Sequence, residues 1–212
     1  MGLARHIRTA RLDTRSEQTA RGAVFGAGCE PGGLAVLHFI NNNDTGKRFI
    51  SVHGVEQTRL AAVLLFTLPG IPLIYAGDEA GAQFEPYSMT ASVDTKSDVN
   101  GLRPLYTRLT HLRRAQLTLR KGSLELLDAD RPQAVLAFAR GLGTADPWIV
   151  VLNFGASPVQ VRLHRPVAQR SWSALDPLTG TDAPVEPSKA IDLPRYGAAL
   201  LHLVSVIAPD QF

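Results

Sequence analysis

Cysteine is almost absent from this sequence of 212 residues, which contains only Cys29. A single thiol excludes an internal disulfide and leaves no cysteine cluster that could hold a metal ion. Cys29 lies in the glycine-rich stretch 22–33, where its small size is sufficient explanation. Neither a disulfide framework nor a thiolate metal site is therefore expected.

Long apolar runs are also missing. The longest run, Leu60 to Leu68, is followed by Pro69-Gly70 and falls short of the roughly 20 residues that cross a bilayer. Residues 1–16 are basic but lack the apolar centre of a secretory signal. Taken as it stands, the chain is expected to have no membrane span and to be cytoplasmic.

The charge excess is small and dispersed, with a formal net charge of +3. The arginines between residues 103 and 120 coincide with an amphipathic helical pattern, so a solvated helix face explains them. Basic residues do not alternate with aromatic ones in the manner of a nucleic-acid-binding groove. Nucleic acid is therefore not an expected partner.

Residues 34–121 have the pattern of two consecutive β-α units. The apolar runs 34–40 and 71–76 each end abruptly at polar residues, which is typical of strands buried on both faces of a parallel sheet. Apolar residues at helical spacing follow each run, at 55–68 and 102–119. Strand, helix, strand, helix predicts part of a parallel α/β fold.

The period changes after Gly122. Short strands separated by turn signals predict an antiparallel β-sandwich, and the expected strands are 124–127, 134–139, 148–154, 159–163, 171–175 and 198–204. The expected organisation is an unassigned segment at 1–33, an α/β region at 34–121 and an all-β domain at 122–212.

Carboxylates follow both expected parallel strands. Asp44 comes after the first strand, and Asp78 and Glu79 come after the second. Functional groups of parallel β-α folds collect in such loops, and Asn or Asp can bind a sugar hydroxyl. A simple turn is an equally good explanation for Asp44 and the better one for Asp78.

Several segments resemble the α-amylase family of glycoside hydrolases, in the family's own order. Phe39-Ile-Asn-Asn-Asn-Asp44 is similar to the motif ending the seventh barrel strand, usually Phe-x-x-Asn-His-Asp, and the segment 68–81 is similar to the eighth-strand segment. The segment 101–114 resembles the last barrel helix, and 193–201 resembles the last strand of the C-terminal β-domain. The resemblance implies a fold that is α/β plus all-β: the last two β-α units of a partial (β/α)8 TIM barrel, followed by an antiparallel β-sandwich.

The resemblance also implies roles for particular residues. Asp44 matches the carboxylate that holds sugar hydroxyls and favours the distorted transition state of a retaining α-glycosidase. The expected substrate-binding residues are Asn42, Asn43 and Arg48, and those expected to shape the eighth-strand loop are Tyr75, Gly77 and Glu79. The expected substrate is an α-glucan or α-glucoside.

Two departures from the family pattern matter. Asn43 stands where the family has His, and an amide can bind a hydroxyl but cannot carry a proton. The family's nucleophile and acid/base belong to the fourth and fifth strands, and nothing here matches those motifs. A complete barrel takes about 250 residues, so the chain is interpreted as a fragment that is inactive alone. Asp44 and Glu79 are not expected to substitute, since no other wall would position the sugar.

Cofactors and partners follow from the same resemblance. No cofactor or metal is expected; calcium is common in the family, but its usual ligands lie outside this segment. One alternative function is non-catalytic carbohydrate binding through Trp148 or Trp172, although a core position is commoner for tryptophans in strands. The other is a subunit that completes its barrel with a partner chain. The linkage, the sugar length, hydrolysis versus transfer, the true start and the oligomeric state are left open.

Overall fold

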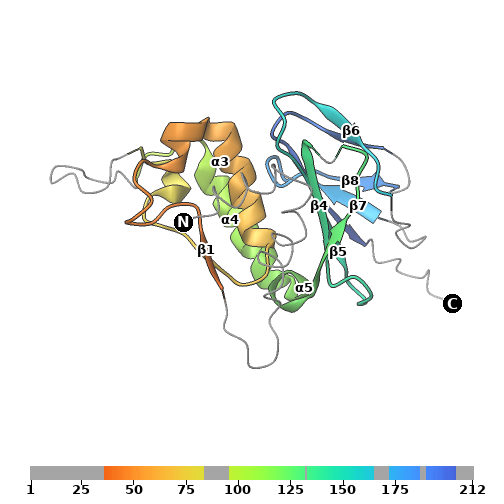
Figure 1. Ribbon diagram of the computed structural model, residues 1–212. Coiled ribbons are helices and arrows are strands. Elements are labelled where there is room, and N and C mark those ends of the chain that lie inside the picture. The colour runs from red at the N-terminus through yellow and green to blue at the C-terminus, as the bar shows by residue number, and fades with distance from the viewer. Residues whose placement is uncertain (1–35, 84–95, 132, 165–171, 187–189, 204–212) are drawn as a thin grey trace, which may run out of the picture. The chain divides into compact units, whose positions relative to one another are not determined.

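The computed structural model describes two compact units, which divide between Leu124 and Glu125 (Figure 1). The described residues are 36–83, 96–131, 133–164, 172–186 and 190–203. The unassigned segment 1–33 lies outside them. Within these ranges, no helix is both long and apolar enough to cross a membrane.

The first unit begins with a β-α-β arrangement. Strand β1 (Leu37–Phe39) pairs in parallel with β2 (Ile71–Leu73), and Leu37 lies opposite Ile71. Helix α3 (Phe49–Thr67) connects the two strands. Parallel strands need such a crossover, and both strands therefore end at the same edge of the sheet.

Helix α3 consists of two segments that meet at Gly54. Gly54 has φ 79° and ψ 175°, a conformation outside the helical region that is open almost only to glycine. The sequence pattern predicted a helix from residue 55, which corresponds to the second segment. The first segment, from Phe49, was missed because its apolar residues do not continue the helical repeat across the glycine.

Helices α3 and α4 (Leu102–Ala115) lie side by side and form the core of this unit (Figure 1). Phe66 and Tyr106 meet edge to face, with ring centroids 5.8 Å apart. The single helix expected over 102–119 is divided at Gln116, beyond which α5 (Leu117–Lys121) begins. Asp98 lies three residues before the N-cap Gly101, and its carboxylate accepts the first helical amides, those of Leu102 and Arg103, at 2.8 and 3.0 Å.

One buried side chain of α4 ties the elements of the first unit together. Arg113 is 7% exposed, and its guanidinium donates to four backbone carbonyls. These belong to Phe66, Leu68, Gly70 and Leu119, at 2.5–3.0 Å. A cation is favourable at the C-terminal end of a helix, and here it also fixes the start of β2 and the position of α5.

Strands β1 and β2 are less buried than the sequence predicted. Leu37 is 50% exposed and Ile71 is 51% exposed, whereas the apolar runs indicated burial on both faces. Only two strands make up this sheet among the described residues, so little covers its side chains. The strands are also shorter than the runs 34–40 and 71–76 suggested.

The described residues of the second unit form two sheets. Six strands form the larger one, in the order β3-β4-β5-β10-β7-β8, and β6 and β9 form the smaller. Strand β10 (Ala198–Leu203) is antiparallel to both β5 (Trp148–Asn153) and β7 (Trp172–Leu175). The remaining strands are β3 (Leu124–Leu127), β4 (Val135–Arg140), β6 (Val159–Val161), β8 (Asp182–Val185) and β9 (Ile191–Leu193).

Apolar residues from both sheets share one core, as in the expected sandwich. It includes Ile149 and Leu201 of the larger sheet and Val161 and Ile191 of the smaller. Strands β8 and β9 were not predicted. Strand β8 is mostly exposed and contains Pro184, which is compatible with the edge of a sheet. Its sequence lacks the alternating apolar pattern by which a strand is predicted.

The two tryptophans are structural. Trp148 is 3% exposed and Trp172 is 2% exposed. Trp172 belongs to the shared core, and the ring of Trp148 stacks on His202 at 4.9 Å. Neither ring offers a face on which a sugar could stack, so this version of the carbohydrate-binding alternative is wrong.

Candidate functional site

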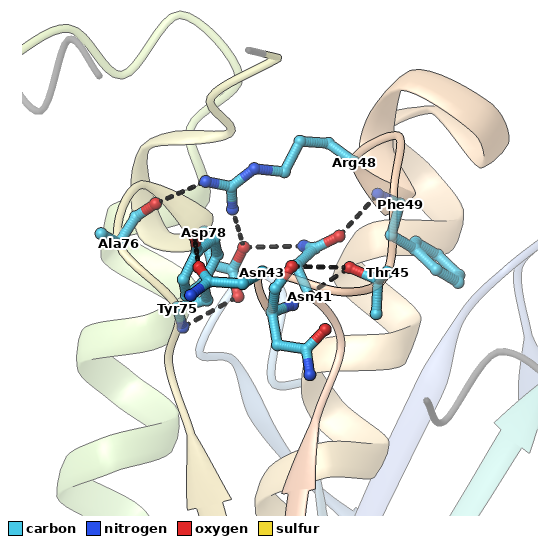
Figure 2. Close-up of polar contacts among 9 residues, drawn as sticks. Asn41, Asn43, Thr45, Arg48, Phe49, Tyr75, Ala76 and Asp78 are labelled. Carbon is cyan, nitrogen blue, oxygen red and sulfur yellow. Dashed lines mark hydrogen bonds and ion pairs between the residues drawn. The ribbon is translucent and has the colours of Figure 1, made fainter. Parts of the chain in front are cut away.

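The candidate site lies where the segments that leave β1 and β2 meet (Figure 2). Because the two strands are parallel neighbours, the polar residues that follow each of them share one edge of the sheet. The first segment runs from Asn41 to the start of α3. The second runs from Tyr75 through the 3-10 turn η1 (Asp78–Ala80).

Asp78 is the centre of the contact. Its Oδ1 accepts hydrogen bonds from Asn41 Nδ2 at 2.7 Å and from Arg48 Nη1 at 2.8 Å. Its Oδ2 accepts the backbone amide of Tyr75 at 3.1 Å. Gly77 precedes it with φ 89°, and this left-handed conformation lets the chain turn back so that Asp78 faces the first segment.

Arg48 reaches from the start of α3 across to the second segment, as Figure 2 shows. Besides its bond to Asp78, it donates from Nη2 to the carbonyl of Ala76 at 2.7 Å, and its guanidinium lies 4.5 Å from the centre of the Tyr75 ring. The side chains of Arg48 and Asp78 are each only 2% exposed. Charges this far from water require close partners.

Burial changes the acidity of both charged groups. Removal from water raises the pKa of Asp78 to about 6, although Asn41 and Arg48 oppose the shift. Burial also lowers the pKa of Arg48, against the attraction of Asp78. In both cases the cost of removing the charge from water outweighs the favourable contacts.

Asp44 lies on the exposed part of the first segment. Its backbone amide donates to Asn42 Oδ1 at 3.0 Å, and the amide of Asn42 donates to Thr45 Oγ1 at 3.1 Å. These bonds make a compact turn, which leaves the Asp44 side chain exposed. The hydroxyl of Tyr75 donates to Asn43 Oδ1, so the two segments also meet at the surface.

The sequence-predicted site residues therefore lie together but differ in position. Asn43 and Asp44 are exposed, and Asn42, Tyr75 and Glu79 are partly buried. Asn42 organises the turn, and Gly77 shapes the second segment. Arg48, expected to bind substrate, is instead buried and bonded to the protein, because Asp78 and Ala76 occupy its guanidinium.

Two residues of the contact were not among the predicted site residues. Asn41 was passed over in favour of its neighbours, yet its Oδ1 also accepts the amide of Phe49 at 2.8 Å. Asp78 was interpreted as a turn residue, and it does form a turn through its amide to Tyr75. The available signal was position: each is a polar residue close to the end of an apolar strand run.

A metal centre has no visible basis in the described part of the chain. No group of three or more His, Cys, Asp or Glu in these ranges could hold an ion. The polar groups of the site include amides, a buried ion pair, a phenol, a hydroxyl, the exposed carboxylate of Asp44 and the partly buried carboxylate of Glu79. Such a set can bind hydroxyl groups and can place a negative charge beside them.

The chain is similar in sequence to proteins named as a neopullulanase and an α-amylase. No protein-family model matches. Over 157 residues the chain is 28% identical to neopullulanase 2 of Thermoactinomyces vulgaris, covering 72% of this chain and 26% of that one. It is 34% identical over 137 residues to the α-amylase MalA of Haloarcula japonica, covering 60% and 19%. The chain thus spans about a quarter or less of these relatives.

Solved structures show the same fold. An Anoxybacillus α-amylase matches with a TM-score of 0.68 at 24% identity, over 80% of this chain and 38% of that one. A maltogenic α-amylase from Thermotoga neapolitana matches with a TM-score of 0.69 at 18% identity, over 96% and 46%.

The sequence comparison and the fold comparison point to the same group of proteins. All four matched proteins are much longer than this chain. The chain is thus similar in sequence and in fold to α-amylase-family glycoside hydrolases, and it matches a C-terminal part of their chains.

Proposed function

We propose that this chain is the C-terminal part of a retaining glycoside hydrolase or transglycosylase that acts on α-glucosidic bonds, and that Asp44 is its transition-state-stabilising carboxylate. The observation that carries the proposal is the position of Asp44. It lies exposed on the segment after β1, beside the segment after the parallel neighbour β2. Active-site groups of β-α barrels occupy such segments.

The proposal gives roles to predicted site residues on both segments. Asn42 and Asn43 lie beside Asp44 and are placed to bind sugar hydroxyls. A carboxylate in this position interacts most strongly when positive charge develops on the sugar ring in the transition state. Tyr75, Gly77 and Glu79 shape the wall formed by the second segment.

Bond cleavage requires two further carboxyl groups, a nucleophile and an acid/base about 5 Å apart. Nothing in this sequence matches the family motifs that carry them. We therefore expect the purified chain to leave maltose, starch and aryl α-glucosides intact. Turnover of an aryl α-glucoside that is lost on Asp44→Asn would contradict this, because the chain would then contain its own catalytic pair.

The role of Asp44 is testable in a version of the protein extended with the missing barrel strands. Asp44→Asn should lower kcat and kcat/KM together, since the interaction is made mainly in the transition state. Asp44→Glu, which keeps the charge on a longer arm, is the matched control and should retain part of the rate. A raised KM with unchanged kcat would assign Asp44 to ground-state binding instead.

A barrel-completing subunit is the second candidate function, and the exposed apolar residues of the short sheet favour it. Val36, Leu37, Ile71 and Ile74 are 39–51% exposed, and unpaired strand edges with apolar side chains favour pairing with another chain. Co-expression with the DNA immediately upstream, followed by size-exclusion chromatography, tests this. Co-elution with a second chain would support it, and an uninterrupted in-frame extension encoding the missing strands would overturn it.

A further inference from the structure

One carboxylate oxygen of Asp78 joins the two ends of the segment that carries Asn43 and Asp44. Asn41 and Arg48 are the residues on either side of the exposed stretch 42–47, and both donate to Asp78 Oδ1, at 2.7 and 2.8 Å. Asn41 Oδ1 also accepts the amide of Phe49 at 2.8 Å, which joins the two ends directly. The buried base therefore fixes where the exposed stretch begins and ends.

These bonds are directional, and each comes from a different element. Asn41 follows β1, Arg48 immediately precedes α3, and Asp78 belongs to η1. The two guanidinium nitrogens of Arg48 have different acceptors, Asp78 Oδ1 and the Ala76 carbonyl. A planar guanidinium that makes two separate bonds fixes orientation as well as distance, which apolar contacts cannot do.

The same bonds are a poor source of stability. Both charged side chains are 2% exposed, and a buried ion pair often stabilises a protein no more than well-packed neutral residues do. Burial shifts the pKa of Asp78 upward and that of Arg48 downward, so each group is less favourable as an ion than it would be in water.

We propose that Asn41, Arg48 and Asp78 are positioning residues, whose role is to hold the stretch 42–47 in place beside the second segment rather than to stabilise the fold. The proposal rests on the proposed function, in which Asp44 of this stretch acts on a sugar. It assigns a purpose to a buried ion pair that contacts no substrate itself.

The test separates local order from global stability in the full chain. Hydrogen–deuterium exchange with mass spectrometry would follow peptides spanning 41–49, and urea denaturation would follow the whole protein. In the neutral double variant Arg48→Met/Asp78→Asn, exchange in 41–49 should be faster by about tenfold or more, with little change in the urea midpoint. Asp78→Asn alone should lower the midpoint, because it leaves Arg48 buried without its counter-charge.

Two further variants isolate geometry from charge. Arg48→Lys keeps the positive charge but loses the planar pair of donors, and it should also increase exchange in 41–49. Glu56→Gln, which removes an exposed carboxylate of α3 outside the site, should leave exchange unchanged.

Any of the following results would overturn the proposal. Exchange in 41–49 of the wild type could be as fast as in an unstructured peptide, exchange in the double variant could be unchanged, or Arg48→Lys could keep full protection. Equal acceleration in 41–49 and in α4, with a lower midpoint, would show general destabilisation and would also overturn it. None of these measurements uses a sugar, so a failure of the proposed catalytic role of Asp44 would leave them unaffected.

Discussion

At the residue scale, two buried arginines of the first unit have different kinds of partner. Arg48 is matched by a carboxylate, Asp78, whereas Arg113 donates to four backbone carbonyls. The first arrangement joins two segments at the candidate site. The second satisfies carbonyls at the end of α3, just before β2 and in α5, and those at a helix end lack partners within the helix. The two arginines are therefore expected to respond differently to substitution.

Removal of Arg113 should destabilise the first unit strongly. Arg113→Met leaves several buried carbonyls without their donor, and we expect the free energy of unfolding to fall by about 3 kcal/mol. Arg114→Met is the matched control; Arg114 is the exposed neighbour, and its loss should cost less than about 0.5 kcal/mol. Urea denaturation of both variants checks this, and equal effects would contradict the assigned role of Arg113.

The raised pKa of Asp78 predicts a particular pH dependence. The pKa is about 6 in the folded state, against 3.8 for the unperturbed group, so between these values the folded protein binds the proton more tightly. The contribution of this group to stability should therefore fall as pH rises from about 4 to about 6, by up to about 3 kcal/mol, and stay level above that. The difference in unfolding free energy between wild type and Asp78→Asn, measured across this range, should show that slope. A flat difference would mean that the pKa is not raised.

At the element scale, Gly54 determines the shape of α3. The chain changes direction at Gly54. The first segment of α3, which follows Arg48, therefore points in a different direction from the second segment, which is the buried core helix. A side chain at Gly54 would meet open space. The only obstacle to substitution is thus the backbone conformation, with φ 79° and ψ 175°.

Gly54→Ala should consequently destabilise the first unit through backbone strain alone. We expect a loss of about 1–3 kcal/mol, without a change in the second unit. Gly122→Ala is a useful comparison, because Gly122 has φ −65°, which any residue adopts. Thermal denaturation would distinguish the two, and a Gly54→Ala protein as stable as wild type would show that α3 can be continuous.

At the scale of the whole molecule, the two units should differ in independence. The second has two sheets around one apolar core, which is sufficient for a small domain. Among its described residues, the first has a two-stranded parallel sheet with exposed Leu37 and Ile71, and a sheet of this size is only marginally stable by itself.

Limited proteolysis should therefore cut first before residue 121 and leave a stable C-terminal fragment. The full chain should self-associate at micromolar concentration, because exposed apolar strands favour contact between copies. Mass spectrometry of the fragments and analytical ultracentrifugation check the two parts. A monodisperse monomer that unfolds in one transition, with no protected fragment, would contradict this division.

The sequence by itself predicted most of the elements and their order, and it showed the resemblance to the α-amylase family. Apolar periodicity identified both parallel strands and the second helix, because strands and helices repeat at 2 and 3.6 residues. The sequence also indicated that Asp44, Asp78 and Glu79 follow the two strand runs, in the loops where functional groups of parallel β-α folds collect. Edge strand β8 escaped this reasoning, since an exposed strand with a proline lacks the apolar signal.

Only the tertiary structure decided which polar residues are buried and what they contact. Asn41, Arg48 and Asp78 are separated by up to 37 positions, and no local pattern shows that two of them would share one oxygen of the third. The sequence therefore suggested Arg48 as a substrate ligand and Asp78 as a turn. Hydrogen bonds between side chains distant in the chain depend on the packing of whole elements. That packing brings Asn41 and Arg48 to Asp78, which lies in a turn and is the centre of the site.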